Sequence, residues 1–97
     1  MTTTATTRRM SELEAKIKEQ ARTHLAYCER VTRERLGDRR FNSDAVFMLD
    51  SGTDVREMSD RWLSVHAQRS WDANQIDDLR KCNLMLARRY WHRAQIA

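Results

Sequence analysis

Apolar residues recur along this chain at alternating intervals of three and four positions, the spacing that places side chains on one face of an α-helix. The longest such run follows Ser11, whose hydroxyl can cap the helix together with Glu14, and it ends at Gly37. No proline occurs in the 97 residues, and both glycines, Gly37 and Gly52, stand where the helical spacing stops. The pattern therefore predicts an all-α protein whose first helix spans residues 11–36.

One face of this first helix carries a seam of mostly apolar residues. About 25 residues at 1.5 Å each form a rod about 37 Å long, which is more than a compact bundle of this mass needs. We therefore expect part of the seam to contact a second copy of the chain, and the alternative is burial within the same chain. The predicted dimer-interface residues are Ile17, Ala21, His24, Cys28 and Val31.

Two shorter segments follow the first helix. Residues 38–42 read as an exposed turn, and Asn42 or Ser43 can cap an apolar run over 45–49, which predicts one or two helical turns. A further segment begins at Thr53, which can cap it. Its apolar stripe consists of Val55, Met58, Trp62 and Val65.

The helical spacing lapses between Val65 and Ile76, where Ser70 or Asp72 could cap a new helix. Neither glycine nor proline enforces a break there, so residues 54–96 form either one helix or two. Asn83 interrupts the apolar face of the last segment. It either fixes the register between packed helices or lies at the solvent-exposed edge of that face. The residues of that face are Ile76, Leu79, Asn83, Leu86 and Tyr90.

Length limits the architecture to one domain. Residues 1–10 predict a disordered tail, and residues 11–97 predict a single bundle of three to four helices. A chain of this size buries only about 60–65% of its unfolded surface, which leaves a thin core and favours a homodimer.

Charge is distributed unevenly along the chain. The protein carries a net charge of +4, with a pI near 9.6. Five acids and one arginine occur in residues 41–60, whereas the last 19 residues contain no acid. Opposed charges of this kind steer protein association.

The basic end supports a second hypothesis, because arginines bind phosphates and aromatic rings stack on bases. Its alternative interpretation is a set of cations that complement the negative end of a helix dipole. The nucleic-acid-binding residues of this hypothesis are Arg80, Lys81, Arg88, Arg89, Tyr90, Trp91 and Arg93.

Catalytic chemistry finds little support in the sequence. It contains no catalytic triad and no phosphate-binding loop. His24 and Cys28 have the spacing of two zinc ligands, but a structural zinc site needs two more, which only a favourable fold could bring from Cys82, His66 or His92. We expect a non-catalytic protein without metal or cofactor.

The expected cellular compartment follows from the spacing of the cysteines and from the lack of a signal region or membrane span in the sequence. Cys28 and Cys82 lie far apart inside helical patterns, unlike the dense framework of a disulfide-rich secreted domain. Residues 1–10 contain no apolar signal region, and no stretch is apolar enough to span a bilayer. We expect a cytoplasmic protein with reduced thiols and no membrane partner.

The layout of the chain as a whole resembles a known class of regulator. A threonine-rich start, a capped first helix, the segment around Trp62 and the arginine-rich end at residues 90–93 are together similar to small quorum-sensing antiactivators of pseudomonads. The resemblance implies a protein that binds a LuxR-type transcription factor and prevents its dimerisation or DNA binding. Tryptophan is enriched at binding hot spots, and we predict Met58, Trp62 and Val65 as the protein-binding residues. The alternative is that this face belongs to the core of the domain.

Overall fold

The computed structural model describes the backbone of residues 2–96 and the side chains of residues 11–96. Within that range every regular element is helical, which confirms the predicted all-α class. An isolated bridge between Met48 and Asp54 closes the loop around Gly52. The elements are α1 (Thr2–Leu36), α2 (Asp38–Phe41), the 3-10 helices η1 (Asp44–Phe47) and η2 (Val55–Glu57), α3 (Asp60–Asp72) and α4 (Ile76–Ile96).

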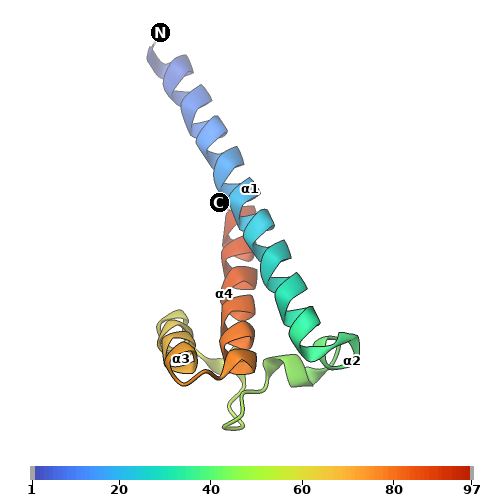
Figure 1. Ribbon diagram of the computed structural model, residues 1–97. Coiled ribbons are helices and arrows are strands. Elements are labelled where there is room, and N and C mark those ends of the chain that lie inside the picture. The colour runs from blue at the N-terminus through green and yellow to red at the C-terminus, as the bar shows by residue number, and fades with distance from the viewer. Residues whose placement is uncertain (1, 97) are drawn as a thin grey trace.

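Helix α4 is the centre of the domain (Figure 1). The C-terminal half of α1 and the whole of α3 pack against different sides of it, and the segment with η1 and η2 closes its lower end. The N-terminal half of α1 extends beyond the last turn of α4, and the molecule measures 57 × 26 × 22 Å. The expected long first helix is therefore present, and about half of it projects from the bundle.

The core consists of two clusters that share α4. One joins α1, α2 and η1 to the Leu84 and Ala87 side of α4, and the other joins α3 and the η1–η2 loop to Leu79 and Cys82. The other buried members are Cys28, Leu36, Phe41 and Val46 in the first cluster, and Leu49, Val55, Leu63 and Ala67 in the second.

Helix α1 starts earlier than the sequence indicated. It begins at Thr2, so Ser11 lies inside it, whereas a tail over residues 1–10 and a cap at Ser11 were expected. Neither glycine nor proline occurs before Ser11, so no residue there interrupts the helix. Met1 and Ala97 lie outside the described residues.

Gly37 ends α1, as the sequence predicted. Gly37 has a φ of 83°, and its amide donates to the carbonyl of Arg33 across 2.8 Å. The expected exposed turn after it is instead the short helix α2, because Phe41 turns inward to join the core.

Of the other expected helix caps, the one at Ser43 is confirmed, and those at Thr53 and at Ser70 or Asp72 are wrong. Ser43 caps η1 as expected, accepting from the amide of Ala45. The cap of α3 is Ser59 rather than Thr53, since its hydroxyl accepts from the amide of Trp62 across 3.2 Å. Ser70 and Asp72 lie within α3.

Residues 54–96 contain two α-helices preceded by a 3-10 turn. Asn74, at a φ of 58°, provides the left-handed residue between α3 and α4. Asparagine tolerates this conformation better than most residues. None of the described helices combines the length and the apolar character that crossing a bilayer requires.

Candidate protein-binding surfaces

The predicted dimer seam is divided by the fold. Cys28 is buried against α4, Ala21 and Val31 are half-buried, and Ile17 and His24 are exposed. The division arises because the buried face of α1, formed by Leu25, Cys28, Thr32 and Leu36, is rotated from the seam and α4 covers only the C-terminal half of the helix.

Helix α1 carries an exposed stripe at helical spacing, and only its first two members lie on the projecting half. We call it the α1 stripe: Leu13, Ile17, His24 and Tyr27. Its apolar members are among the most exposed large hydrophobic residues of the described chain. A shallow hollow of about 460 Å³ lies beside His24 and Tyr27. Sequence reasoning missed Leu13 and Tyr27, although they continue the same intervals of three and four.

Trp62 is the exposed member of the predicted protein-binding triad. Its side chain is 53% exposed on α3. The ring lies 6.0 Å from that of His66, and the guanidinium of Arg69 lies 6.0 Å from its centroid. Met58 and Val65 are half-buried, and Met58 packs against the core. The structure thus places one anchor-sized aromatic residue, rather than three residues, at this surface.

Trp71 marks a different surface of the same helix. It is nine residues, or about two and a half helical turns, from Trp62 and therefore lies on the opposite side of α3. Its side chain is 64% exposed. A groove of about 480 Å³ runs beneath it between α3 and α4. Asn83 is half-buried in this groove rather than in the core. The groove is lined by Ser64, Ala67, Gln68, Trp71, Leu79, Arg80, Asn83 and Leu86.

The basic residues of α4 are not gathered on a single face. Lys81 is buried and donates from Nζ to the carbonyl oxygen of Met48 across 2.7 Å. Arg80 lies at the groove below Trp71, and Trp91 is half-buried. Tyr90 is exposed, with the guanidinium of Arg93 4.8 Å from its ring centre.

Three of the predicted nucleic-acid-binding arginines do come together. Positions 85, 88, 89, 92 and 93 share one side of α4 by helical spacing. There they line a shallow, open and mostly apolar hollow of about 420 Å³ on the surface of this one helix, which we call the arginine hollow: Met85, Arg88, Arg89, His92 and Arg93.

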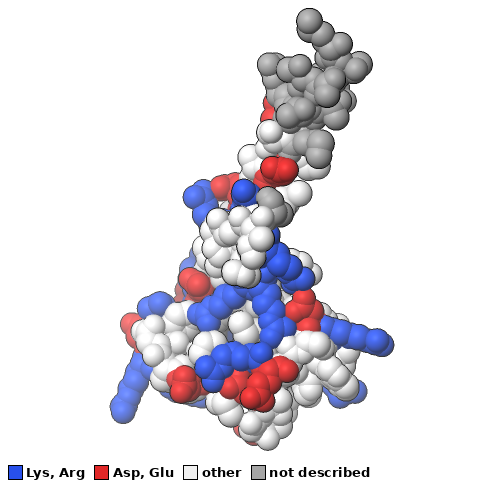
Figure 2. Space-filling model, turned by 180° about the vertical axis from the view of Figure 1, so that it is seen from behind, with Lys and Arg blue, Asp and Glu red and all other residues white. Residues whose placement is uncertain are grey.

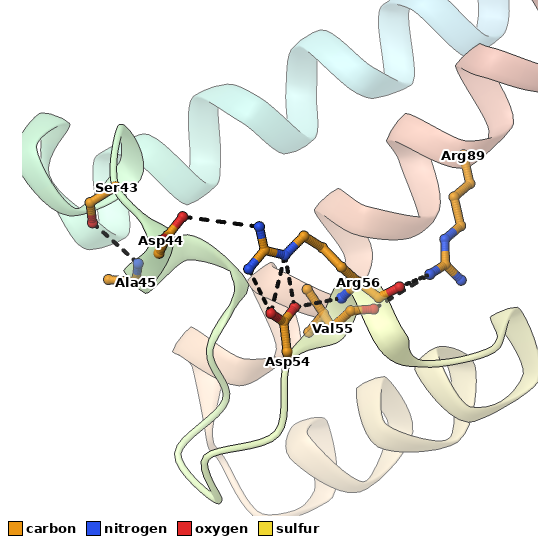
Figure 3. Close-up of polar contacts among 7 residues, drawn as sticks. All are labelled: Ser43, Asp44, Ala45, Asp54, Val55, Arg56 and Arg89. Carbon is orange, nitrogen blue, oxygen red and sulfur yellow. Dashed lines mark hydrogen bonds and ion pairs between the residues drawn. The ribbon is translucent and has the colours of Figure 1, made fainter.

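The acidic segment packs against this basic helix. Both Arg89 and Arg93 contact the carboxylate of Asp60 at 2.8 Å. Arg89 also donates to the carbonyl oxygen of Arg56 across 3.2 Å (Figure 3). The opposed charges noted in the sequence therefore partly neutralise each other within one molecule, and Figure 2 shows acidic and basic side chains side by side on the lower part of the domain.

Asp54 and Arg56 form the tightest ion pair of the η2 region. Arg56 Nη2 lies 2.6 Å from Asp54 Oδ2, and Asp44 lies 4.0 Å from the same guanidinium (Figure 3). The hydrogen bonds from Arg56 lower the pKa of Asp54. Hydrogen bonds from Arg89 and then from Arg93 lower the pKa of Asp60. Both carboxylates are thus held in their charged form.

The cysteines are free thiols in the core. Burial raises the pKa of Cys82 to about 11, with a smaller contribution from Asp78, and burial also raises the pKa of Cys28. His24 Nε2 lies 3.7 Å from Cys28 Sγ. Within the described residues no third histidine, cysteine or acid joins this pair to make a metal-binding group.

A polar pocket of about 460 Å³ lies between the end of α1 and the start of α4. Four of its charged side chains, those of Arg35, Asp77, Asp78 and Lys81, contact one another or the backbone. Arg35 Nε is 2.6 Å from Asp77, and the carboxylate of Asp78 accepts from the amide of Asp50 across 3.1 Å. The first contact joins α1 to α4, and the second holds the η1–η2 loop on α4.

The chain matches no protein-family model, no curated protein and no solved structure at a significant level.

Proposed function

We propose that this chain is a non-catalytic, cytoplasmic regulatory protein that acts by binding another protein. The observation that carries the proposal is the projecting half of α1, whose exposed Leu13 and Ile17 have no covering element among the described residues. A helix with an exposed apolar stripe gains stability when a second surface covers it.

The first partner is a second copy of the chain. The α1 stripe extends the predicted dimer seam toward the N-terminus, and Ile17 and His24 belong to both. In a symmetric dimer the same stripe is used twice, which buries the apolar residues of both copies in one step. Cys28, being covered by α4, contributes to the core of each subunit instead.

The second partner is a transcription factor of the LuxR type, as the resemblance to quorum-sensing antiactivators implies. Trp62 is the proposed anchor, because an exposed tryptophan flanked by Arg69 and His66 has the composition of an interface hot spot. Binding there would block dimerisation or DNA binding of the factor.

A gel-shift titration tests this function. A purified LuxR-type regulator is bound to its operator DNA, and the full chain is added in increasing amounts. We expect the bound fraction of DNA to fall, with much weaker release by the Trp62→Ala variant. Unchanged DNA binding, together with an unchanged oligomeric state of the regulator at excess chain, would exclude it as the partner.

Direct nucleic-acid binding is the second candidate function. The grouping of Arg88, Arg89 and Arg93 at the arginine hollow favours it, whereas the pairing of two of them with Asp60 weakens it. A salt titration with duplex and single-stranded oligonucleotides separates the two functions. A steep loss of affinity with salt supports nucleic-acid binding, and an absence of binding at low salt eliminates it.

A further inference from the structure

A hollow between α1 and α4 lies at the C-terminal end of the α1 stripe. It has a volume of about 330 Å³, and we call it the α1–α4 hollow. Its lining comes from two helices and consists of Val31, Glu34, Arg35, Ile76 and Arg80. Val31 and Ile76 are half-buried and supply its apolar surface. Because Val31 follows Tyr27 by four positions, the helical face that carries the stripe leads into this hollow.

The edge of the hollow next to α4 is positively charged. Arg35 Nε lies 2.6 Å from Asp77, whereas no carboxylate of the described side chains lies within 4.0 Å of the Arg80 guanidinium. Burial raises the pKa of Cys28, and the charge of Arg80 opposes this rise, so that charge lies near α1. Glu34 precedes Arg35 and points about 100° away from it, on the side of α1 that is turned from α4.

The projecting half of α1 carries the complementary pattern. Leu13 is 58% exposed and stands between Glu12 and Glu14, which are also exposed. Residues 11–15 contain no basic residue. An apolar side chain between two acids thus matches an apolar hollow that is bordered by arginines.

An antiparallel pair of α1 helices brings these two patterns together. In such a pair apolar residues oppose apolar ones and polar residues oppose polar ones. The opposed residues are Leu13 and Val31, Ile17 and Tyr27, and Gln20 and His24. The two-fold axis passes beside Ala21, whose small side chain allows a close approach. The buried face of α1 is roughly a third of a turn from the stripe, so α4 leaves room for the second helix.

A parallel pair would leave the hollow unused. Each stripe residue would then face its own counterpart, with Leu13 about 27 Å along the helix from Val31. Arg30 of one copy would flank the seam beside Arg35 of the other, where like charges repel. Only the antiparallel direction places an acidic segment against the positive edge of the hollow.

We infer that two copies pair through antiparallel α1 helices, and that each α1–α4 hollow receives Leu13 of the other copy, with Glu14 of that copy beside Arg35 and Arg80. This inference rests on the proposed self-association, and it assigns the direction of the helices and a contact site on α4. Two-fold symmetry forms the contact twice. Trp62 lies on α3, outside this contact, and stays available to the transcription factor.

Disulfide trapping of the full-length chain tests the direction. Leu13→Cys and Val31→Cys chains are oxidised as a mixture and separately. We expect a covalent dimer from the mixture and at least about tenfold less from either chain alone, because a disulfide needs Cα atoms within about 7 Å. Wild type, whose Cys28 and Cys82 are buried, is the background control.

Charge reversal tests the contact at the hollow. Glu14→Arg and Arg80→Glu should each raise the dimer Kd at least about tenfold in sedimentation, and the double variant should recover most of that loss. Glu57→Arg, at an exposed position of η2, is the matched control and should dimerise as wild type does. Thermal melting shows that each variant is folded. If Arg80→Glu is unfolded, Glu14→Arg is measured in an Arg80→Gln background, where its effect should shrink.

Two results would overturn the inference: a Leu13→Cys chain that links to itself as efficiently as the mixture does, or an effect of Glu14→Arg that is independent of residue 80. If the wild-type chain dimerises in either case, the inference alone is wrong. If the wild-type chain stays monomeric, the proposed self-association is wrong as well.

Discussion

Lys81 donates a hydrogen bond from its ammonium group to the carbonyl oxygen of Met48 across 2.7 Å. The lysine side chain is 6% exposed and belongs to the central helix, whereas Met48 follows η1 in the connecting loop. Because the two residues are 33 positions apart, the contact fastens the η1–η2 loop to α4. A residue that the sequence placed in a nucleic-acid-binding segment thus has a structural partner.

Replacing Lys81 by alanine should destabilise the fold. The change leaves the Met48 carbonyl without its donor and removes the packed stem of the lysine, so we expect a loss of about 1–3 kcal/mol in the free energy of unfolding. Denaturant unfolding followed by circular dichroism measures it. Arg39→Ala, at an exposed position of α2, should change stability by less than about 0.5 kcal/mol. Equal stability of the two variants would contradict the prediction.

Trp62 and its neighbour Leu63 should respond to truncation in opposite ways. Leu63 is fully buried, so Leu63→Ala should cost about 2–5 kcal/mol of stability. Trp62→Ala should leave the melting temperature nearly unchanged and cost at least about 2 kcal/mol of partner binding. Trp71→Ala removes an equally large exposed ring from the opposite side of α3 and is the control for binding. A strongly destabilised Trp62→Ala variant would show that Trp62 has a structural role and would contradict its role in recognition.

Ile17 should control self-association. Placing a carboxylate in the α1 stripe puts a charge into the proposed dimer interface, so Ile17→Asp should shift the protein toward monomer at micromolar concentration. Sedimentation velocity measures the distribution. Ala26→Asp, exposed elsewhere on α1, introduces the same charge and should remain a dimer. A wild-type protein that sediments as an 11.5 kDa monomer would rule out the dimer.

Asp60 should make stability depend on pH in the acid range. Its pKa is lowered in the folded state by the hydrogen bond from Arg89 and then by that from Arg93. The carboxylate therefore stabilises the fold above its ordinary pKa of about 3.9, and this contribution is lost as the pH falls through the lowered value. Melting temperatures of wild type and Asp60→Asn should differ at pH 7, begin to converge as the pH falls below about 4, and meet only below the lowered pKa of the folded state. A difference that stays constant with pH would argue against the ion pairs as its source.

The thiols of Cys28 and Cys82 should react slowly in the native protein. Both are buried, and a pKa of about 11 keeps Cys82 protonated at neutral pH. Since the thiolate is the reactive form, labelling by a disulfide reagent should require opening of the core and should become fast in denaturant. Rapid labelling of the folded protein would show that α1 or α3 opens readily from α4.

The sequence by itself determined the local structure of the chain. The missing proline, the apolar spacing and Gly37 act over a few residues each, and they were sufficient for the all-α class, the long first helix and its end. Where several residues compete for one role, local information was weaker. Ser59, Thr53 and Ser70 are all capable caps, and which one caps a helix depends on where the chain turns.

Tertiary structure alone decided which helical faces are covered. Periodicity shows which residues share a face, but Cys28 and Ile17 lie on the same predicted seam, and one is buried while the other is exposed. The direction from which α4 packs on α1 and the point where α4 ends decide this difference. The same holds for charge. The acidic segment and the basic helix read as opposite poles in the sequence, whereas folding pairs Asp60 with Arg89 and leaves Arg88 without a carboxylate partner among the described side chains. Such pairings depend on contacts between residues far apart in the chain, which no local pattern encodes.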